Sequence, residues 1–431
     1  MLSSFFIRNF RSILELRLDF SYGEGKAPNG YKDQNQEILP FIEANRTTRL
    51  VPCLAFFGAN ASGKTNLLRA FDAFQQLIIK GGKLADRFEP NLLNPKFTET
   101  TFEIEFYLGY DRFTYRISYS AEAISEECLL KNGRNIFGIH QLGAEFSPQI
   151  LSAAYSKEKV SEILRVQCTD GEGRQIKPFL NLIGRDYPGL HPDLKSAFGF
   201  FQSRITIFDV SRPIGLPYAV DLLASTMGNV EAAALREITD VVRRLDIDIA
   251  DIRISETKLL PDEPHHLGCL LKQDLDTGAR YSVNIHTTHQ DVTGNSVALN
   301  FIKHESAGTQ RLAGLIALIL RALKTGEVLL VDELESSLHP LLMREIVLLF
   351  KKRRYNPKGA QLIFTTHNTD ILDDSILRLS EIALVRKTVA NGTLVRRLVD
   401  AKKDGEDIRN VTNFRKQYLA GFYSGVPHPA L

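Results

Sequence analysis

Residues 58–65 have the residue types and spacing of a phosphate-binding loop. Their sequence, GANASGKT, fits the pattern G-x-x-x-x-G-K-[ST] at every fixed position. The glycines let the backbone turn tightly, the Lys64 ammonium can reach the β/γ-phosphates, and the Thr65 hydroxyl can bind Mg²⁺. The segment therefore predicts a nucleotide site for ATP with Mg²⁺, and the residues expected to contact the nucleotide are Gly58, Ala59, Asn60, Ala61, Ser62, Gly63, Lys64, Thr65 and Asn66.

The sequence on either side of this loop supports the same interpretation. An apolar run, residues 50–57, precedes it, and an amphipathic helical pattern, residues 66–79, follows it. The loop would then connect a strand to a helix whose free N–H groups and positive dipole end face the anion.

Asp332 and Glu333 are the second group of candidate site residues. They follow four aliphatic residues, 328–331, which predict a buried strand. A carboxylate at the C-terminal end of a parallel strand lies where ligands bind in open α/β sheets. Asp332 can bind Mg²⁺ directly or through water, and Glu333 can orient or deprotonate the attacking water. Two acids after an aliphatic run are common at strand ends, and the phosphate-binding loop gives this pair its significance.

Ser306, Gly308 and Thr309 precede residues 311–323, which are apolar nearly all round and predict a buried helix. They could form a second anion cradle at the helix N-terminus, or Ser306 could simply cap that helix. His367 follows a predicted strand, residues 361–364, and could donate a hydrogen bond to the γ-phosphate. A lone histidine in such a place more often has a structural role.

Other groups of charged residues have simpler interpretations. The pairs His265-His266 and His286/His289 lack acid or cysteine partners at metal-ligand spacing. The basic run at residues 351–354 favours a solvated helix end over a DNA-binding surface. No Ser/His/Asp or Cys/His arrangement indicates a hydrolase of another kind.

The composition is that of an ordinary soluble protein. The 431 residues are 44% hydrophobic and 24% charged, and the formal charge of +2 gives no bulk electrostatic argument for nucleic-acid binding. The four cysteines have no pairing or metal-ligand spacing, which favours a reducing compartment. No signal peptide is recognisable, and the longest apolar stretch is too short to span a bilayer. We therefore expect a cytoplasmic protein.

The order of the motifs carries a family resemblance. The phosphate-binding loop, Ser306-x-Gly308-Thr309, Asp332-Glu333, residues 336–339 (SSLH) and His367 resemble the Walker A, signature, Walker B, D-loop and switch-histidine motifs of ABC-type ATPases. Residues 7–12 (IRNFRS) look like the start of the branch that includes RecF, SMC and OLD-like ATPases. Residues 305–312 (ESAGTQRL) and 418–427 (YLAGFYSGVP) resemble the AAA15-type ATPases of prokaryotic abortive-infection and antiphage defence loci.

This resemblance implies a fold and a division of the chain. The fold is α/β: an ABC-type P-loop NTPase head, with a mixed sheet, helices on both faces and an antiparallel β lobe, split by a largely helical insertion. Alternating patterns at residues 101–108 and 112–120, and at 381–386 and 393–398, predict the hairpins of such a head. The implied segments are 1–147 and 305–400 for the two halves of the head, 148–245 for the helical insertion, 246–304 for a β segment and 401–431 for a tail.

The resemblance also implies an activity. Such ATPases hold ATP between the phosphate-binding loop of one subunit and the signature of another, so we expect a homodimer or higher homo-oligomer, with Ser306 and Gly308 closing on a neighbour's γ-phosphate. We expect an ATP hydrolase that acts as sensor or regulator in antiphage defence and controls an effector protein, such as a Toprim-like nuclease or another toxin. The alternatives are a RecF/SMC-like repair ATPase that clamps DNA, and a scaffold that binds ATP without hydrolysing it.

Two departures from the ABC pattern concern the signature and the Q-loop. Ala307 and Thr309 replace residues of the usual Leu-Ser-Gly-Gly-Gln wording. Gln75 and Gln76 come too soon after Lys64 to supply the Q-loop glutamine. How the nucleotide would be coupled to the insertion is therefore left open by the sequence.

Overall fold

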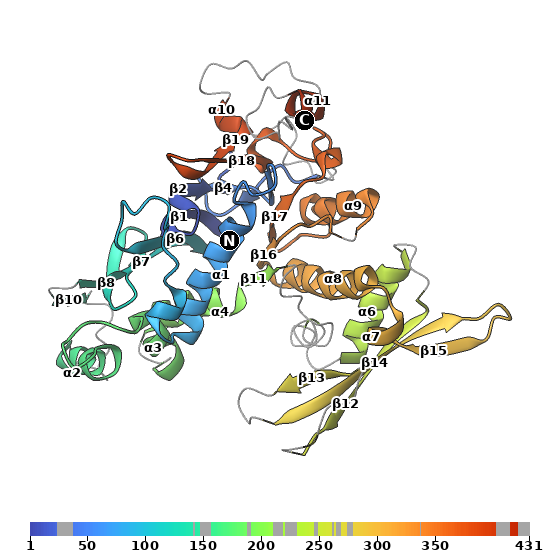
Figure 1. Ribbon diagram of the computed structural model, residues 1–431, viewed down its shortest axis with the longest axis horizontal. Coiled ribbons are helices and arrows are strands. Elements are labelled where there is room, and N and C mark those ends of the chain that lie inside the picture. Colours follow the sequence, from blue (N-terminus) through green and yellow to red (C-terminus); the bar gives the residue numbers. More distant parts are fainter. Residues whose placement is uncertain are drawn as a thin grey trace. The chain divides into compact units, whose positions relative to one another are not determined.

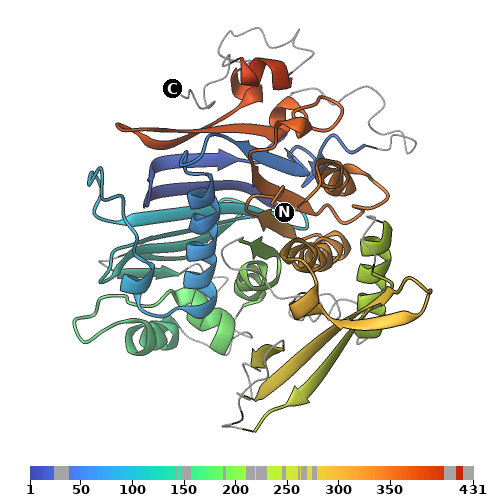
Figure 2. The ribbon, with the colours of Figure 1, turned by 45° about the vertical axis from the view of Figure 1, so that its right-hand side comes forward.

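The computed structural model describes residues 1–23, 38–140, 143–146, 157–187, 191–209, 219, 231–244, 249–260, 263, 269–273, 279–336, 338–401 and 414–420. The chain forms two compact units. Unit 1 comprises residues 1–207, 326–332 and 347–431, and unit 2 comprises residues 208–325 and 333–346. Figures 1 and 2 show their helices and strands in two views.

One large mixed sheet dominates unit 1. In the described part of the chain it has thirteen strands, in the order β10-β9-β8-β7-β6-β1-β2-β19-β18-β5-β17-β16-β11. Four central strands run parallel: β16 (Val328–Val331), β17 (Gln361–Thr366), β5 (Cys53–Phe57) and β18 (Ile382–Thr388). Every residue of β5 is buried, as expected for a parallel strand covered on both faces. Because β5 lies between two strands from the far end of the chain, the predicted split α/β fold is confirmed.

An antiparallel lobe continues this sheet. β18 pairs with β19 (Gly392–Arg397), and β19 meets β2 (Ile13–Asp19) at Gly392 and Ile13. Beyond β2 follow β1 (Leu2–Phe10), β6 (Thr100–Leu108), β7 (Asp111–Tyr119), β8 (Ile124–Lys131), β9 (Arg134–His140) and β10 (Gly143–Phe146), each antiparallel to its neighbour. The two predicted hairpins are confirmed, whereas β8, β9 and β10 lie where the sequence analysis predicts no strand.

Helix α1 (Lys64–Lys80) covers one face of the sheet, as Figure 2 shows. The centroid of its Phe71 ring lies 4.1 Å from that of Phe5 in β1, and the centroid of its Phe74 ring lies 5.2 Å from that of Phe102 in β6. Helices α3 (Phe179–Asp186) and α4 (Pro192–Ser203) extend this aromatic core, with Phe201 5.4 Å from Phe74. This packing fixes the helix that begins at the phosphate-binding loop.

Helices also cover the opposite face. Leu54 and Phe56 of β5 belong to the core under α1, so the alternating residues Cys53 and Phe57 point the other way. The Cys53 thiol contacts the carbonyl of Val347, in the C-terminal part of α9 (Pro340–Lys351), at 3.8 Å. The Phe57 ring lies 6.3 Å from Tyr418 of α11 (Phe414–Leu419). The central strands are therefore sandwiched between helices, as predicted.

The remaining elements of unit 1 are short. They are β3 (Ile42–Glu43), β4 (Arg49–Leu50), η1 (Leu84–Arg87), α2 (Lys157–Ile163), a π-helical turn (Leu164–Cys168), β11 (Ile205–Phe208), η4 (Thr369–Ile371), η5 (Leu379–Glu381) and α10 (Leu398–Ala401). Between residues 148 and 245 the described elements are thus mainly helical.

Unit 2 combines helices with a small antiparallel sheet (Figure 1). Its helices in the described ranges are α6 (Glu231–Arg244), α7 (Phe301–His304), the mostly buried α8 (Ala307–Thr325) and the first part of α9, up to residue 346. Its strands are β12 (Asp251–Lys258), β13 (Leu270–Gln273), β14 (Arg280–Gln290) and β15 (Ser296–Asn300), with β14 pairing with all three others. His265 and His266 lie outside the described residues.

Within the basic run at residues 351–354, the environment of Lys351 differs from the predicted one. This side chain is 2% exposed, and its ammonium contacts the carbonyl of Ile376 and, at 2.5 Å, the carboxylate of Glu381. The prediction of a solvated helix end is therefore wrong for this residue. A tertiary partner that is distant in the sequence accounts for its burial.

The cysteines are free thiols. Burial raises the pKa of Cys128 and of Cys168 to about 12, so both remain protonated near neutral pH. Of the helices in the described ranges, none is long and apolar enough to cross a membrane.

Candidate nucleotide-binding site

The predicted motifs of unit 1 meet at one edge of the parallel sheet. Gly58 follows β5, Asp332 follows β16 and His367 follows β17. The register pairs Phe57 with Thr366 and Val331 with Phe364, so these three strands end almost level with one another. The C-terminal edge of parallel strands is where α/β proteins bind their ligands.

The phosphate-binding loop closes around the Lys64 ammonium. The loop turns through Ala61, with φ of 60°, and Gly63, with φ of 102°, before α1 begins at Lys64. Lys64 is 5% exposed, and its Nζ donates hydrogen bonds to the carbonyls of Gly58 at 2.8 Å and Ala59 at 2.9 Å. A buried ammonium thus lies beside the N-terminus of α1, and these two sources of positive potential favour an anionic ligand.

Thr65 and Asp332 come together although 267 residues separate them in the chain. The Thr65 hydroxyl lies 3.4 Å from Asp332 Oδ1. The same oxygen accepts a 2.6 Å hydrogen bond from the buried Thr365 hydroxyl, and Asp332 itself is 4% exposed. A hydroxyl and a carboxylate are the oxygen ligands that Mg²⁺ takes in nucleotide sites. Among the described residues, this site included, no group of three or more His, Cys, Asp or Glu residues could hold a metal ion.

Residues that no sequence motif indicates support this loop from behind. Ser12 accepts a 2.7 Å hydrogen bond from the Asn66 amide and lies 2.7 Å from the Thr393 hydroxyl, which reaches the Ser62 carbonyl at 3.4 Å. A Cβ on Gly63 would lie 2.1 Å from Thr393 Oγ1, so this glycine is required. Ser12 belongs to the segment IRNFRS, whose residue types alone indicate no contact with the loop.

Glu333, the next residue after Asp332, belongs to unit 2 and has a strained backbone. Its φ is 47°, a region that a non-glycine residue occupies at a cost of about 1–3 kcal/mol. The guanidinium of Arg311, on α8, donates a 3.1 Å hydrogen bond to the Glu333 carbonyl and lies 5.4 Å from the Phe208 ring. Arg311 therefore ties Glu333 to the helix that begins at the predicted signature.

Ser306 caps helix α8. Its hydroxyl accepts a 3.1 Å hydrogen bond from the Thr309 amide and lies 2.9 Å from the Thr309 hydroxyl. Ser306 therefore makes the capping contact that the sequence offered as one alternative. That Ser306 and Gly308 form an anion cradle stays a prediction. Ser306 and Ala307 are exposed at the start of the helix.

His367 is exposed at the end of β17, so its role toward a phosphate stays a prediction. The next residue, Asn368, accepts a 2.8 Å hydrogen bond from the Asp370 amide and caps η4. Ser337, in the predicted D-loop, and residues 421–427, in the C-terminal motif, lie outside the described residues.

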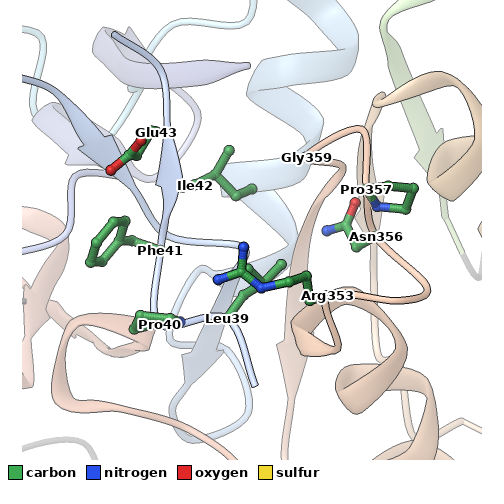
Figure 3. Close-up of a pocket in the computed structure, with 9 residues that line it drawn as sticks. All are labelled: Leu39, Pro40, Phe41, Ile42, Glu43, Arg353, Asn356, Pro357 and Gly359. Carbon is green, nitrogen blue, oxygen red and sulfur yellow. The ribbon is translucent and has the colours of Figure 1, made fainter. Parts of the chain in front are cut away.

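A pocket of about 490 Å³ lies near the opposite ends of the parallel strands (Figure 3). Asn356 and Gly359, which precede β17, line it together with Arg353 and residues 39–43. Asn356 is 2% exposed, and its amide holds the turn before β17 through the carbonyls of Phe350 and Ala360. None of the predicted site residues lines this pocket, which is therefore distinct from the candidate nucleotide site.

Comparison with known families gives one match. The family model described as "AAA domain, putative AbiEii toxin, Type IV TA system" matches residues 53–139 and 178–373, more than half of the chain. The matched ranges include the phosphate-binding loop, Asp332-Glu333 and His367. No match was found among the curated proteins.

Two solved structures are similar over most of the chain. One, described as "Crystal structure of the SmcHead bound to the C-winged helix domain of ScpA", is 14% identical, with 93% of this chain and 99% of that chain covered and a TM-score of 0.42. The SMC head domain from Thermotoga maritima is 13% identical, with 92% and 98% covered and a TM-score of 0.38.

Proposed function

Because the chain belongs to the AbiEii-type AAA-domain family of P-loop ATPases, we propose that it is a Mg²⁺-dependent ATP hydrolase whose ATP-bound form dimerises. The observation that supports this most directly is the approach of the Thr65 hydroxyl to Asp332 beside the Lys64 ammonium. Two distant segments thereby supply one set of oxygen ligands and one cation for a triphosphate.

In this proposal the residues of unit 1 bind and polarise the nucleotide. The amides of residues 58–65 and the N-terminus of α1 surround the phosphates, and the Lys64 ammonium exchanges its contacts with Gly58 and Ala59 for β/γ-phosphate oxygens. Thr65 and Asp332 would hold Mg²⁺, which when bound neutralises charge on the phosphates. His367 would donate a hydrogen bond to the γ-phosphate.

Glu333 is the proposed general base of the reaction. Its carboxylate would accept a proton from a water molecule that attacks the γ-phosphorus in line with the leaving ADP oxygen. Ser306, Gly308 and Thr309 of a second copy would close on the same γ-phosphate. This arrangement makes hydrolysis dependent on dimerisation and leaves the products in an interface that can reopen.

We further propose a role in antiphage defence as an AAA15-type ATPase. The family description names AbiEii toxins and type IV toxin–antitoxin systems, and residues 305–312 resemble AAA15-type sequences, both of which support this setting. ATP-driven dimerisation would regulate a partner effector such as a Toprim-like nuclease. Residues 1–147 and 305–400 would form the two halves of the ATPase head, with 148–304 inserted between them.

Hydrolysis and dimerisation are tested together with Glu333→Gln. We expect this variant to bind ATP, to lose turnover and to accumulate a dimer or larger assembly with ATP and Mg²⁺, as measured by light scattering. Glu345→Gln, an exposed acid on α9, is the matched control and should behave like the wild type. Unchanged turnover in Glu333→Gln would exclude Glu333 as the general base. A variant that is monomeric both with and without ATP would count against the proposed dimer.

The defence role is tested in cells that carry the gene together with its neighbouring genes. Wild type should protect against phage, whereas Lys64→Ala and Glu333→Gln should not. Equal protection by the wild type and both variants would show that any role in defence does not depend on the nucleotide site.

A further inference from the structure

Glu305 connects the small sheet of unit 2 to the turn that begins α8. One carboxylate oxygen, Oε1, accepts a 2.6 Å hydrogen bond from the Thr287 hydroxyl and lies 2.6 Å from Nε2 of His289. Both partners belong to β14, and their alternate spacing places them on the same face of that strand. Thr287 is fully buried and the Glu305 side chain is 10% exposed, so these contacts are largely shielded from water.

Hydrogen bonds also hold the backbone of Glu305 in place. Its amide donates to the Phe301 carbonyl at 3.1 Å, closing α7. The Gln310 side chain, from the first turns of α8, donates to the Glu305 carbonyl at 3.0 Å and also reaches the carbonyls of Phe301 and Ile302. The residue before Ser306 therefore has little freedom to move independently of β14.

We propose that Glu305 is a positioning residue for the signature turn and that Thr287 and His289 hold it in place. This inference rests on the proposed ATP-dependent dimer. Ser306 and Gly308 must face a neighbour's γ-phosphate with a fixed orientation, because a poorly oriented donor contributes little to binding at an interface. The hydrogen bonds to Glu305 fix that orientation before ATP arrives, so the position of β14 determines how readily two copies close.

The same geometry identifies the route by which unit 2 influences ATP turnover. β14 is the one strand that pairs with β12, β13 and β15 among the described residues. A partner that shifts this sheet would shift Thr287 and His289, and with them the start of α8. Arg311, on the same helix, donates to the Glu333 carbonyl. Movement of the sheet would therefore change both the signature turn and the proposed base.

The test compares ATP binding with ATP-driven dimerisation, all in the Glu333→Gln background. Adding Thr287→Val or Glu305→Gln should leave the monomer's affinity for a fluorescent ATP analogue unchanged. Either should raise the ATP concentration needed for half-maximal dimerisation about three- to tenfold, since Thr287→Val removes the hydroxyl donor and Glu305→Gln replaces a carboxylate acceptor with a weaker amide oxygen. Thr287→Ser, which keeps the hydroxyl, should restore the original value, a rescue that a general folding defect would not give.

His286→Ala is the matched control, because His286 is an exposed histidine on the other face of the same strand. It should dimerise as the Glu333→Gln parent does, whereas His289→Ala should be impaired. Equal dimerisation of the parent and its Thr287→Val and Glu305→Gln derivatives would overturn the positioning role while leaving the proposed function intact. A parent that stays monomeric with ATP would instead overturn the dimer, and this inference with it.

Discussion

The hydroxyl of Thr365 donates a 2.6 Å hydrogen bond to Asp332 Oδ1. The two residues are neighbours across the parallel strands β16 and β17, one step beyond the pairing of Val331 with Phe364. Thr365 thereby fixes the rotation of the carboxylate whose same oxygen approaches Thr65. The ligand geometry of the proposed Mg²⁺ site depends on a residue that does not itself contact the nucleotide in our proposal.

Thr365→Val should therefore weaken Mg²⁺ binding without removing any proposed ligand. We expect the Mg²⁺ concentration for half-maximal ATP hydrolysis to rise about tenfold, the range typical of partners that orient metal ligands. A Mg²⁺ titration of the ATPase rate measures this. Thr365→Ser keeps the hydroxyl and should stay close to the wild type; an unchanged Mg²⁺ requirement in Thr365→Val would show that Asp332 needs no such support.

Lys64→Ala should abolish nucleotide binding at micromolar ATP. The ammonium is buried within the loop, and losing its charge-assisted bonds to phosphate should cost about 1.5–3 kcal/mol for each bond, or at least tenfold in affinity. Isothermal titration calorimetry with ATP and Mg²⁺ checks this. Lys80→Ala, at the exposed end of the same helix, is the control and should bind as the wild type does. Equal affinities of the two variants would exclude a role for Lys64 in phosphate binding.

Arg311→Ala should lower the rate of hydrolysis more than it lowers ATP affinity. The bond from Arg311 ties the carbonyl of Glu333, whose backbone is strained at φ of 47°, to α8, whereas the bond that this carbonyl accepts from the Ser336 amide at 2.9 Å is local to the turn. We expect kcat to fall at least tenfold with KM changed less than threefold, because a small misplacement of a catalytic group is costly. Lys324→Ala, which removes an ion pair with Glu237 at the other end of α8, should leave both constants near their original values. A loss confined to KM would argue against this explanation.

Glu127 should make the folded protein less stable as the pH rises. Its carboxylate is fully buried and accepts hydrogen bonds from Tyr115, Gln175 and the amides of Phe179 and Leu180 at the start of α3. Burial raises its pKa above the ordinary value of 4.5, with those hydrogen bonds opposing the shift. The folded state therefore holds the proton more tightly than the unfolded chain, and the stability that this gives is complete below pH 4.5 and is lost as the pH rises through the folded pKa.

Urea unfolding of the wild type and Glu127→Gln at several pH values above 4.5 tests this sign. The wild type should lose up to about 1.4 kcal/mol per pH unit from this group, and the variant should lack that contribution to the slope. Glu126→Gln, on the partly exposed side of β8, controls for removing a charge nearby. Parallel pH profiles for the wild type and Glu127→Gln would contradict the raised pKa.

The sequence allows the central part of this fold to be predicted because its signals are local. Four aliphatic residues before Asp332 predict β16, and the apolar run before Gly58 predicts β5, since buried parallel strands have this composition. The proximity of Thr65 to Asp332 then follows from a general rule about where parallel strands end. No distant contact had to be known to place these residues at one edge.

Contacts that depend on strand register or on distant partners were not predictable in this way. Thr365 orients Asp332 only because β16 and β17 pair in one particular register. Thr393 supports Gly63 only because β19 pairs with β2 at Gly392 and Ile13. Lys351 looks like an ordinary basic residue at a helix end until Glu381 is placed beside it. The positive φ of Glu333 has no signal in residue type either, because glycine or asparagine is the usual occupant of that region.

The position of β5 between β17 and β18 has a consequence for synthesis of the protein on the ribosome. Both neighbours of β5 lie more than 300 residues later in the chain, so neither edge of this strand can form its native pairing until β17 and β18 have been translated. Until then the nascent chain carries an apolar strand with two open edges, which is a hazard for aggregation and a reason to require chaperones. It also means that a chain that ends before β17 and β18 cannot assemble the parallel sheet beside the phosphate-binding loop, so such a truncated product would lack the proposed nucleotide site.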